Sequence, residues 1–297
     1  MKIICCMLAA AGFVHAATGD VEVDLANALK RLASHKNYVW ETIITPATVS
    51  IEVTPPAPRI RPLDETDFRP PPPSGPVPIL GRTDTERGTL IEGIVSSFGD
   101  PLSMRIVIWG DRRAAETPEG WLTQREIEDT AASVQPTKRR LPGPPTPENI
   151  YSIGNHRISK SAYFHAGRFY ISLRPPLEEL QMLFADAGPA MGMERKIVRT
   201  LSESAARTFW HDLRFRDGGN STENAPSSVE GNVTIWLKGN EISKYEVVVT
   251  GDVAARSDDP TYKGREHTIR LVKTTTLSGF DRTKVSIPRE ALAKLGP

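Results

Sequence analysis

The stretch VEGNVTIWLKGN, residues 229–240, alternates apolar residues with polar residues and one tryptophan before it ends in Gly239-Asn240. A period of two predicts a strand with one buried face, and the Gly-Asn pair predicts a tight turn. Ile242–Thr250 returns with a second strand, and a third is predicted over His267–Leu277. With a short terminal helix over 289–295, the C-terminal quarter is expected to form an antiparallel meander.

The first residues of the chain predict export. Lys2 precedes an apolar run, Ile3–Val14, and Val14-His15-Ala16 supplies small or aliphatic residues where a signal peptidase reads them. Residues 1–16 are therefore expected to form a signal peptide, and the run is too short to anchor the chain in a bilayer. The protein is expected to be periplasmic or secreted, and soluble after cleavage.

The composition of the mature chain excludes several kinds of site. Cys5 and Cys6 are the only cysteines and lie inside the expected signal peptide, so no disulfide and no cysteine metal site is expected after cleavage. Removal of Lys2 leaves 37 − 1 = 36 basic side chains against 36 acidic ones. A net charge of zero gives no basic excess, so no nucleic-acid partner is expected.

Residues 17–297 are expected to form a single domain with two proline-rich excursions, at 46–80 and 136–149. Each proline removes a backbone donor that a helix or sheet would use, so the first excursion is not expected to contain a central strand. The excursions would act either as extended spacers or as contacts for an envelope protein partner.

Hydrophobic periodicity and capping residues predict most of the remaining elements. The sequence Thr123-Gln-Arg-Glu126 is a capping box, in which each side chain can bind a free backbone N–H of the other residue. The segment 150–173 is aromatic but has no consistent period, so no element is predicted there. Strands are predicted at 38–44, 89–95, 102–108 and 114–117. Helices are predicted near 20–36, from 124 to about 133, from Pro175-Pro176 to a stop at Gly188-Pro189, and from 202 to 213.

Sequence signatures of catalysis and of metal binding are missing. The chain has no His-Glu-x-x-His, no Gly-x-Ser-x-Gly and no phosphate-binding glycine loop followed by lysine. His211-Asp212 is the best remaining pair, but neighbouring residues on a helix point in different directions. The sequence therefore predicts no catalytic residue, no metal ligand and no cofactor. A hydrolase is a third alternative, and it would require His156 or His165 to meet a carboxylate and a hydroxyl in one cleft.

Several short motifs occur in an order that resembles a known superfamily. They are Tyr38-Val-Trp40, Ile91-Glu-Gly93, Glu119-Gly-Trp121, Leu201–Ala206, Gly231–Leu237, Thr274–Thr276 and Val285–Ala291. Together they resemble the LolA-like lipoprotein-carrier superfamily, more closely its exported bacterial members than LolA itself. The resemblance implies an α+β fold, an open antiparallel β half-barrel with helices packed in its concave face. It also implies an apolar interior that carries acyl chains or lipids.

Two functional hypotheses follow from the residues and the resemblance. The first is an exported, non-enzymatic binding protein that carries or senses a lipid, acyl chain or lipoprotein in the half-barrel groove. The alternative is a structural or protein-interaction component of the cell envelope with a filled core. The side chains expected to line the groove of a binding protein are Trp40, Ile108, Trp236, Val247 and Leu271.

Overall fold

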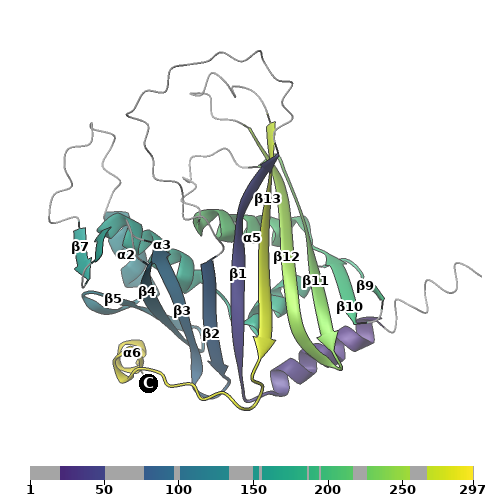
Figure 1. Cartoon of the computed structure of the whole chain (residues 1–297), viewed down its shortest axis with the longest axis horizontal. Helices are drawn as coiled ribbons and strands as arrows, with labels where there is room; N and C mark the ends of the chain where they lie inside the picture. The colour runs from purple at the N-terminus through teal and green to yellow at the C-terminus, as the bar shows by residue number, and fades with distance from the viewer. Residues whose placement is uncertain are drawn as a thin grey trace, which may run out of the picture.

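The computed structural model describes residues 21–50, 77–96, 101–133, 150–153, 156–185, 187–193, 195–216, 226–254 and 266–296. Within these residues, eleven strands form one antiparallel sheet in the order β6-β5-β4-β3-β2-β1-β13-β12-β11-β10-β9. The edge strands β6 and β9 do not pair with each other, so the sheet is open (Figure 1). The expected α+β fold, an open antiparallel half-barrel with helices against its concave face, is confirmed.

The elements have the following bounds. The strands of the large sheet are β1 (Asn37–Ser50), β2 (Val77–Asp84), β3 (Gly88–Ser96), β4 (Pro101–Trp109), β5 (Arg112–Thr117), β6 (Gly120–Thr123), β9 (Met191–Met193), β10 (Lys196–Thr200), β11 (Ser228–Lys238), β12 (Glu241–Ala254) and β13 (Glu266–Ser278). β7 (Ile150–Ile153) and β8 (His156–Ser159) form a separate hairpin. An N-terminal helix covers 21–34, and the other helices are α2 (Gln124–Ser133), α3 (Lys160–Ser172), α4 (Pro176–Phe184), α5 (Glu203–Arg216) and α6 (Arg289–Leu295).

The strand that comes first along the chain, β1, is the central strand of the sheet. β1 pairs with β2 on one side and with β13 on the other, so Thr42 lies opposite both Ile79 and Thr275. The strands β2 to β6 continue away from β1 in chain order, and β12 to β9 continue in reverse order from β13. The sheet therefore consists of an N-terminal and a C-terminal half that meet along β1 and β13.

Helices cover the two faces of this sheet unequally. The concave face packs against α3, α4 and α5, and their apolar side chains join those of the strands in one large core. Helix α6 lies on the opposite, outer face, where Ala291 and Leu295 pack against Leu90, Val107 and Ala114 (Figure 1). The outer face thus has a small core of its own over β3, β4 and β5.

The alternation that opens the sequence analysis is borne out in β11. Val229, Val233, Ile235 and Leu237 are buried, whereas Trp236 has the opposite orientation and is half-buried. The predicted Gly239-Asn240 turn connects β11 to β12, and Gly239 has a positive φ of 64°. This turn needs the left-handed conformation that glycine adopts without a steric penalty.

The expectation that no central strand would form in 46–80 was wrong at both ends of that segment. β1 continues through Pro46 to Ser50, and β2 begins at Val77. Pro46 lies at a register shift between Thr45 and Thr48, where the missing backbone donor interrupts a ladder that is already irregular. Pro78 pairs with β1 only, because the pairing of β2 with β3 begins at Leu80. Residues 51–76 and the second excursion, 136–149, lie outside the described residues.

Glycines on the concave face accommodate aromatic rings. A Cβ atom at Gly81 would overlap the indole of Trp40 on the neighbouring strand, and one at Gly93 would overlap the phenol ring of Tyr170 on α3. At Gly251 a Cβ would lie 2.9 Å from Trp210 of α5. These glycines are therefore required by close packing, since any larger residue would displace a buried ring.

The predicted capping box forms at the start of α2. The Thr123 backbone N–H donates to Glu126 Oε2 at 2.8 Å, and the Glu126 N–H donates to Thr123 Oγ1 at 3.4 Å. Glu126 also accepts a 2.7 Å hydrogen bond from Lys294 Nζ of α6. One carboxylate thus caps α2 and connects it to the C-terminal helix.

The stability that Glu126 provides is expected to disappear in acid. Its Lys294 partner, together with the Thr123 backbone, lowers the Glu126 pKa from 4.5 to about 2. Because the folded pKa is depressed, the contribution is complete above about pH 4.5 and is lost as the pH falls toward 2. The pair is partly exposed, so we expect Glu126→Gln to cost at most about 1 kcal/mol at pH 7 and clearly less at pH 2, where about half of the carboxylate is protonated. Urea unfolding at several pH values measures this difference, and an equal cost at pH 7 and pH 2 would contradict the assignment.

Candidate functional site

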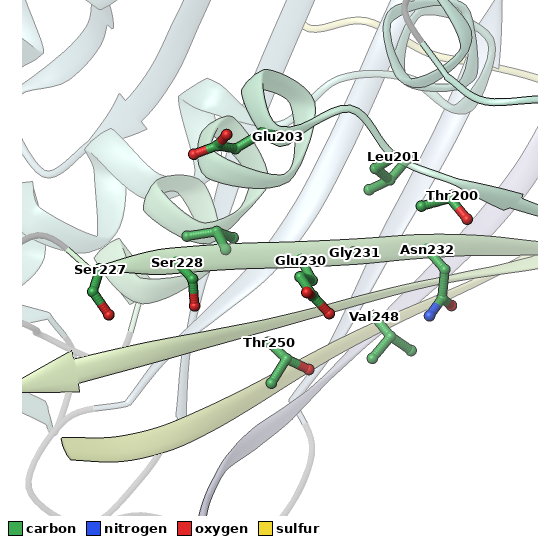
Figure 2. A pocket seen from close by; sticks show the side chains of 11 residues that line it. Thr200, Leu201, Glu203, Ser227, Ser228, Glu230, Gly231, Asn232, Val248 and Thr250 are labelled. Atoms are coloured by element: carbon green, nitrogen blue, oxygen red, sulfur yellow. The ribbon is translucent and has the colours of Figure 1, made fainter.

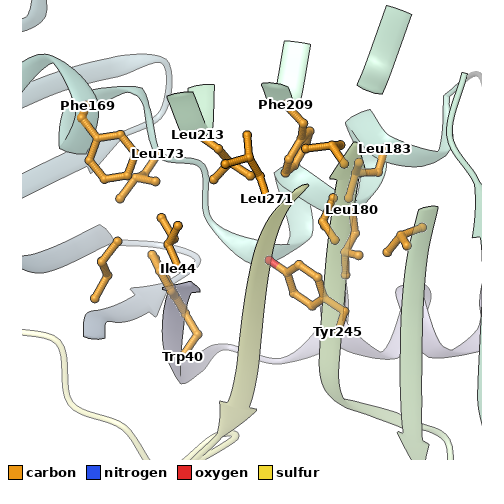
Figure 3. Close-up of a cluster of buried hydrophobic side chains, with 14 of the residues drawn as sticks. Trp40, Ile44, Phe169, Leu173, Leu180, Leu183, Phe209, Leu213, Tyr245 and Leu271 are labelled. Atoms are coloured by element: carbon orange, nitrogen blue, oxygen red, sulfur yellow. The ribbon is translucent and has the colours of Figure 1, made fainter. Parts of the chain in front are cut away.

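The space between the concave face and the helices is lined almost entirely by apolar side chains. Inward-facing residues of the strands, such as Trp40, Ile44, Tyr245 and Leu271, meet Leu180 of α4 (Figure 3). All five are 2% exposed or less. The interior of the half-barrel is thus a continuous apolar layer filled by the protein's own side chains.

A buried cluster of charged and polar groups interrupts this layer. Lys273 of β13 and Glu179 of α4 are 5% and 2% exposed, and Lys273 Nζ lies 2.6 and 2.8 Å from the two carboxylate oxygens of Glu179. The Tyr245 hydroxyl donates to Glu179 Oε2 at 2.8 Å. Burial raises the pKa of Tyr245 well above its usual range, so this hydroxyl remains a donor. Three hydrogen bonds therefore hold the Glu179 carboxylate against the sheet.

The cluster continues toward solvent through a second charged pair. Arg174 Nη1 lies 3.4 Å from Asp212 Oδ2 of α5, and both side chains are partly exposed. Burial raises the pKa of Asp212, and Arg174 opposes that shift. A cavity of about 20 Å³ lies between the two pairs. It is lined by Phe169, Ser172, Leu173, Arg174, Glu179, Phe209, Asp212, Leu213 and Lys273.

Neither Glu179 nor Lys273 was predicted as a site residue, although the periods of α4 and β13 place both at core positions. The buried positions of α4 are Pro176, Glu179, Leu180 and Leu183, the spacing of one helix face, so Glu179 occupies a core position. Lys273 likewise falls in the inward series of β13 that runs from Ile269 to Leu277. A charged residue at a position that the period assigns to the core is the available sequence signal.

The five residues expected to line a groove do not share one face. Trp40, Ile108, Val247 and Leu271 all belong to the large core on the concave face, although Ile108 on β4 and Val247 on β12 lie on strands that are not neighbours. Trp236 pairs with Lys244 on the outer face of the sheet. Its ring lies 4.4 Å from Lys244 Nζ and 5.7 Å from Lys196 Nζ. Trp236 therefore cannot line the same space as the other four.

A wider hollow lies at the outer side of β11 and β12, with a volume of about 820 Å³ (Figure 2). Its lining includes the outward-facing Glu230, Asn232, Val248 and Thr250, and it continues past Thr200 to the start of α5. Hydroxyl, amide and carboxylate groups dominate this surface. The hollow is thus poorly suited to an apolar chain, which makes the interior the stronger candidate site.

The histidines singled out in the sequence form no catalytic pair among the described side chains. The sequence pair His211-Asp212 separates as expected, since His211 is exposed and Asp212 pairs with Arg174. In the described residues no three His, Cys, Asp or Glu side chains come together as metal ligands would. The side chains of His156 and His165 fall outside the described set. Among the described helices, none has the length and apolar character needed to cross a membrane.

Comparison with known proteins finds similarity only among solved structures, since no family model and no curated protein matches the sequence. The Mycobacterium tuberculosis lipoprotein LppX is 9% identical with a TM-score of 0.33, over 90% of this chain and 98% of that one. LprF from Mycobacterium bovis is 8% identical with a TM-score of 0.35, over 91% and 96%. A LolA superfamily protein from Nitrosomonas europaea is 8% identical with a TM-score of 0.31, over 90% and 94%.

The third of these proteins belongs to the superfamily that the sequence motifs resemble. All three TM-scores are below 0.5 and all identities are below 10%, so these similarities say nothing of what this chain binds.

Proposed function

We propose that this protein is an exported, non-enzymatic binding protein that holds an apolar chain, such as an acyl chain, between the concave face of the sheet and helices α4 and α5. One observation carries the proposal: the sheet is open, and its apolar concave face is covered by helices. A short helix can move away from a sheet without breaking a strand ladder. We further propose a periplasmic or secreted location, consistent with the signal peptide expected at residues 1–16.

Helix α4 is the part of the cover that would have to move. It has nine residues, and its N-cap, Pro175, makes no side-chain capping hydrogen bond. Its own residues Leu180 and Leu183 are fully buried against the sheet, and Glu179 connects the helix to β12 and β13. An acyl chain that replaced these leucines would find the same apolar surroundings, so loading would exchange one set of apolar contacts for another.

Uptake of a fatty acid tests the proposal. Protein purified from its own envelope is expected to retain an apolar ligand in native mass spectrometry, and the delipidated protein should bind a fluorescent fatty acid. Hydrogen exchange should increase in α4 on loading, because its buried leucines leave the interior. A matched control is Trp236→Leu, which removes an aromatic surface from the outer face and should leave uptake unchanged.

The alternative function, a structural or interaction protein of the envelope, is favoured by a different observation. The interior is filled, and the described part of its lining encloses a cavity of only about 20 Å³. Under this alternative the protein would carry no ligand from the envelope, would take up no fatty acid and would show unchanged exchange in α4. That combined result would overturn the binding proposal.

A further inference from the structure

Lys273 is a charged residue on the apolar concave face of the sheet. It lies midway along β13, between the inward-facing residues Leu271 and Thr275, and is 5% exposed. Its ammonium lies 5.7 Å from the centre of the Phe209 ring on α5. An ammonium in such surroundings requires a negative partner, because desolvation of an unpaired charge is costly.

The negative partner of Lys273 comes from helix α4, which covers the concave face, and not from the sheet. Glu179 belongs to α4, whereas Lys273 and Tyr245 belong to β13 and β12. The hydrogen bonds described for Lys273 Nζ all go to the two oxygens of Glu179. Any movement of α4 that admits a ligand would therefore remove the carboxylate that neutralises the Lys273 ammonium.

We propose that the ligand is an amphiphile with a carboxylate head group, which replaces Glu179 at Lys273 when α4 moves away. This inference rests on the proposed binding function and specifies its ligand class. A neutral lipid would leave the ammonium without a hydrogen-bonded carboxylate, with Asp212 as the other anionic side chain of the cavity, whereas a carboxylate head group restores both hydrogen bonds and accepts a hydrogen bond from the Tyr245 hydroxyl. The Lys273 ammonium, once Glu179 is displaced, thus favours amphiphiles with an anionic head group over neutral ones of the same chain length.

The hydrogen-bond donors around the small cavity are consistent with a carboxylate head group. The cavity holds roughly one water molecule and is bordered by Lys273 and Arg174. Lys273 has three N–H donors, of which two are directed to Glu179. Arg174 has five: Nη1 bonds Asp212, and Nε lies 3.8 Å from Glu178 Oε1. The Glu179 oxygens already accept three hydrogen bonds, so the N–H groups of Lys273 and Arg174 that are not directed to Glu179 or Asp212 can bind an acceptor-rich head group at the cavity.

Calorimetric titration of the delipidated full-length mature protein with palmitate, methyl palmitate and hexadecanol tests the proposal. Palmitate is expected to bind about tenfold or more tightly than either neutral analogue. The Glu179→Gln variant should bind palmitate more tightly than wild type, because the competing carboxylate is gone. In the double variant Glu179→Gln/Lys273→Met, palmitate should lose its advantage while methyl palmitate still binds.

A matched control is Glu203→Gln/Arg207→Met, which removes an exposed ion pair with a 2.7 Å contact on α5 and should retain the preference for palmitate. Equal affinity of the wild-type protein for palmitate and methyl palmitate would overturn the head-group inference and leave the proposed function intact. So would a preference that survives in the Glu179/Lys273 double variant. If none of the three compounds binds, the proposed function itself fails. The wild-type comparison requires no variant to fold.

Discussion

Alanine at either Glu179 or Lys273 alone is expected to lower the free energy of unfolding by about 3–5 kcal/mol. Each single change leaves the other charge buried, at 2% or 5% exposure, without the partner that neutralises it. The Tyr245 hydroxyl also loses its acceptor when Glu179 is removed. Urea unfolding at pH 7 measures the loss.

The double variant Glu179→Gln/Lys273→Met should lie within about 1 kcal/mol of the wild-type protein, because a buried pair replaced as a unit leaves no isolated charge. The glutamine retains an oxygen that can accept the Tyr245 hydroxyl. An exposed pair provides the control: Arg125 and Asp129 are 3.9 Å apart with side chains 92% and 75% exposed, so Asp129→Ala should cost less than about 0.5 kcal/mol. If the costs of the single variants Glu179→Gln and Lys273→Met simply add in the double variant, the two charges are not coupled.

Gly81→Ala is expected to destabilise the protein by about 3 kcal/mol, the upper end of the range for overpacking. The added methyl group would occupy the position of the Trp40 indole, which is 2% exposed. The ring cannot move easily, because its Nε1–H donates to Thr83 Oγ1 at 3.1 Å. Thermal and urea unfolding of the variant measure the effect.

The same substitution at Gly167 is the matched control. A Cβ there would meet Ile127 at an ordinary 3.7 Å, and the residue lies within α3. Since alanine favours helix, Gly167→Ala should be neutral or should stabilise by up to about 1 kcal/mol. In the double variant Gly81→Ala/Trp40→Leu the cost of Gly81→Ala should shrink, because a smaller side chain vacates the contested space. A cost that is unchanged in the Trp40→Leu background would disprove the steric explanation.

The fold was predictable where one period ran through a whole element. β11 and β12 followed their alternation, and α2 began at the residue that its capping box indicated. The strand β2 was missed because Pro78 suggested irregular structure, and a sequence alone does not show that this proline lies outside the pairing with β3. The helix α3 was missed because its buried aromatic residues obscure a single apolar stripe.

The candidate site was predictable only in its apolar part. Trp40, Val247 and Leu271 could be assigned to an interior, since each lies in an alternating strand. The pairing of Glu179 with Lys273 joins residues 94 positions apart, and no local pattern connects them. Trp236 was placed with the other four because large aromatic rings are usually buried, yet the alternation of β11 assigns it to the other face.

The position of β1 at the centre of the sheet also determines when the fold can be completed. β1 begins at Asn37, and its partner β13 ends at Ser278, so Val39 meets the last residue of a strand that is synthesised long after it. Closing so long a loop is entropically costly, and strands that pair over long distances form late. A ribosome-bound chain that lacks β13 has unpaired edges on both β1 and β12. The ladder between β1 and β13 can therefore form only after β13 has been synthesised, whereas hairpins such as β3–β4 need no residues beyond their own strands and the connection between them.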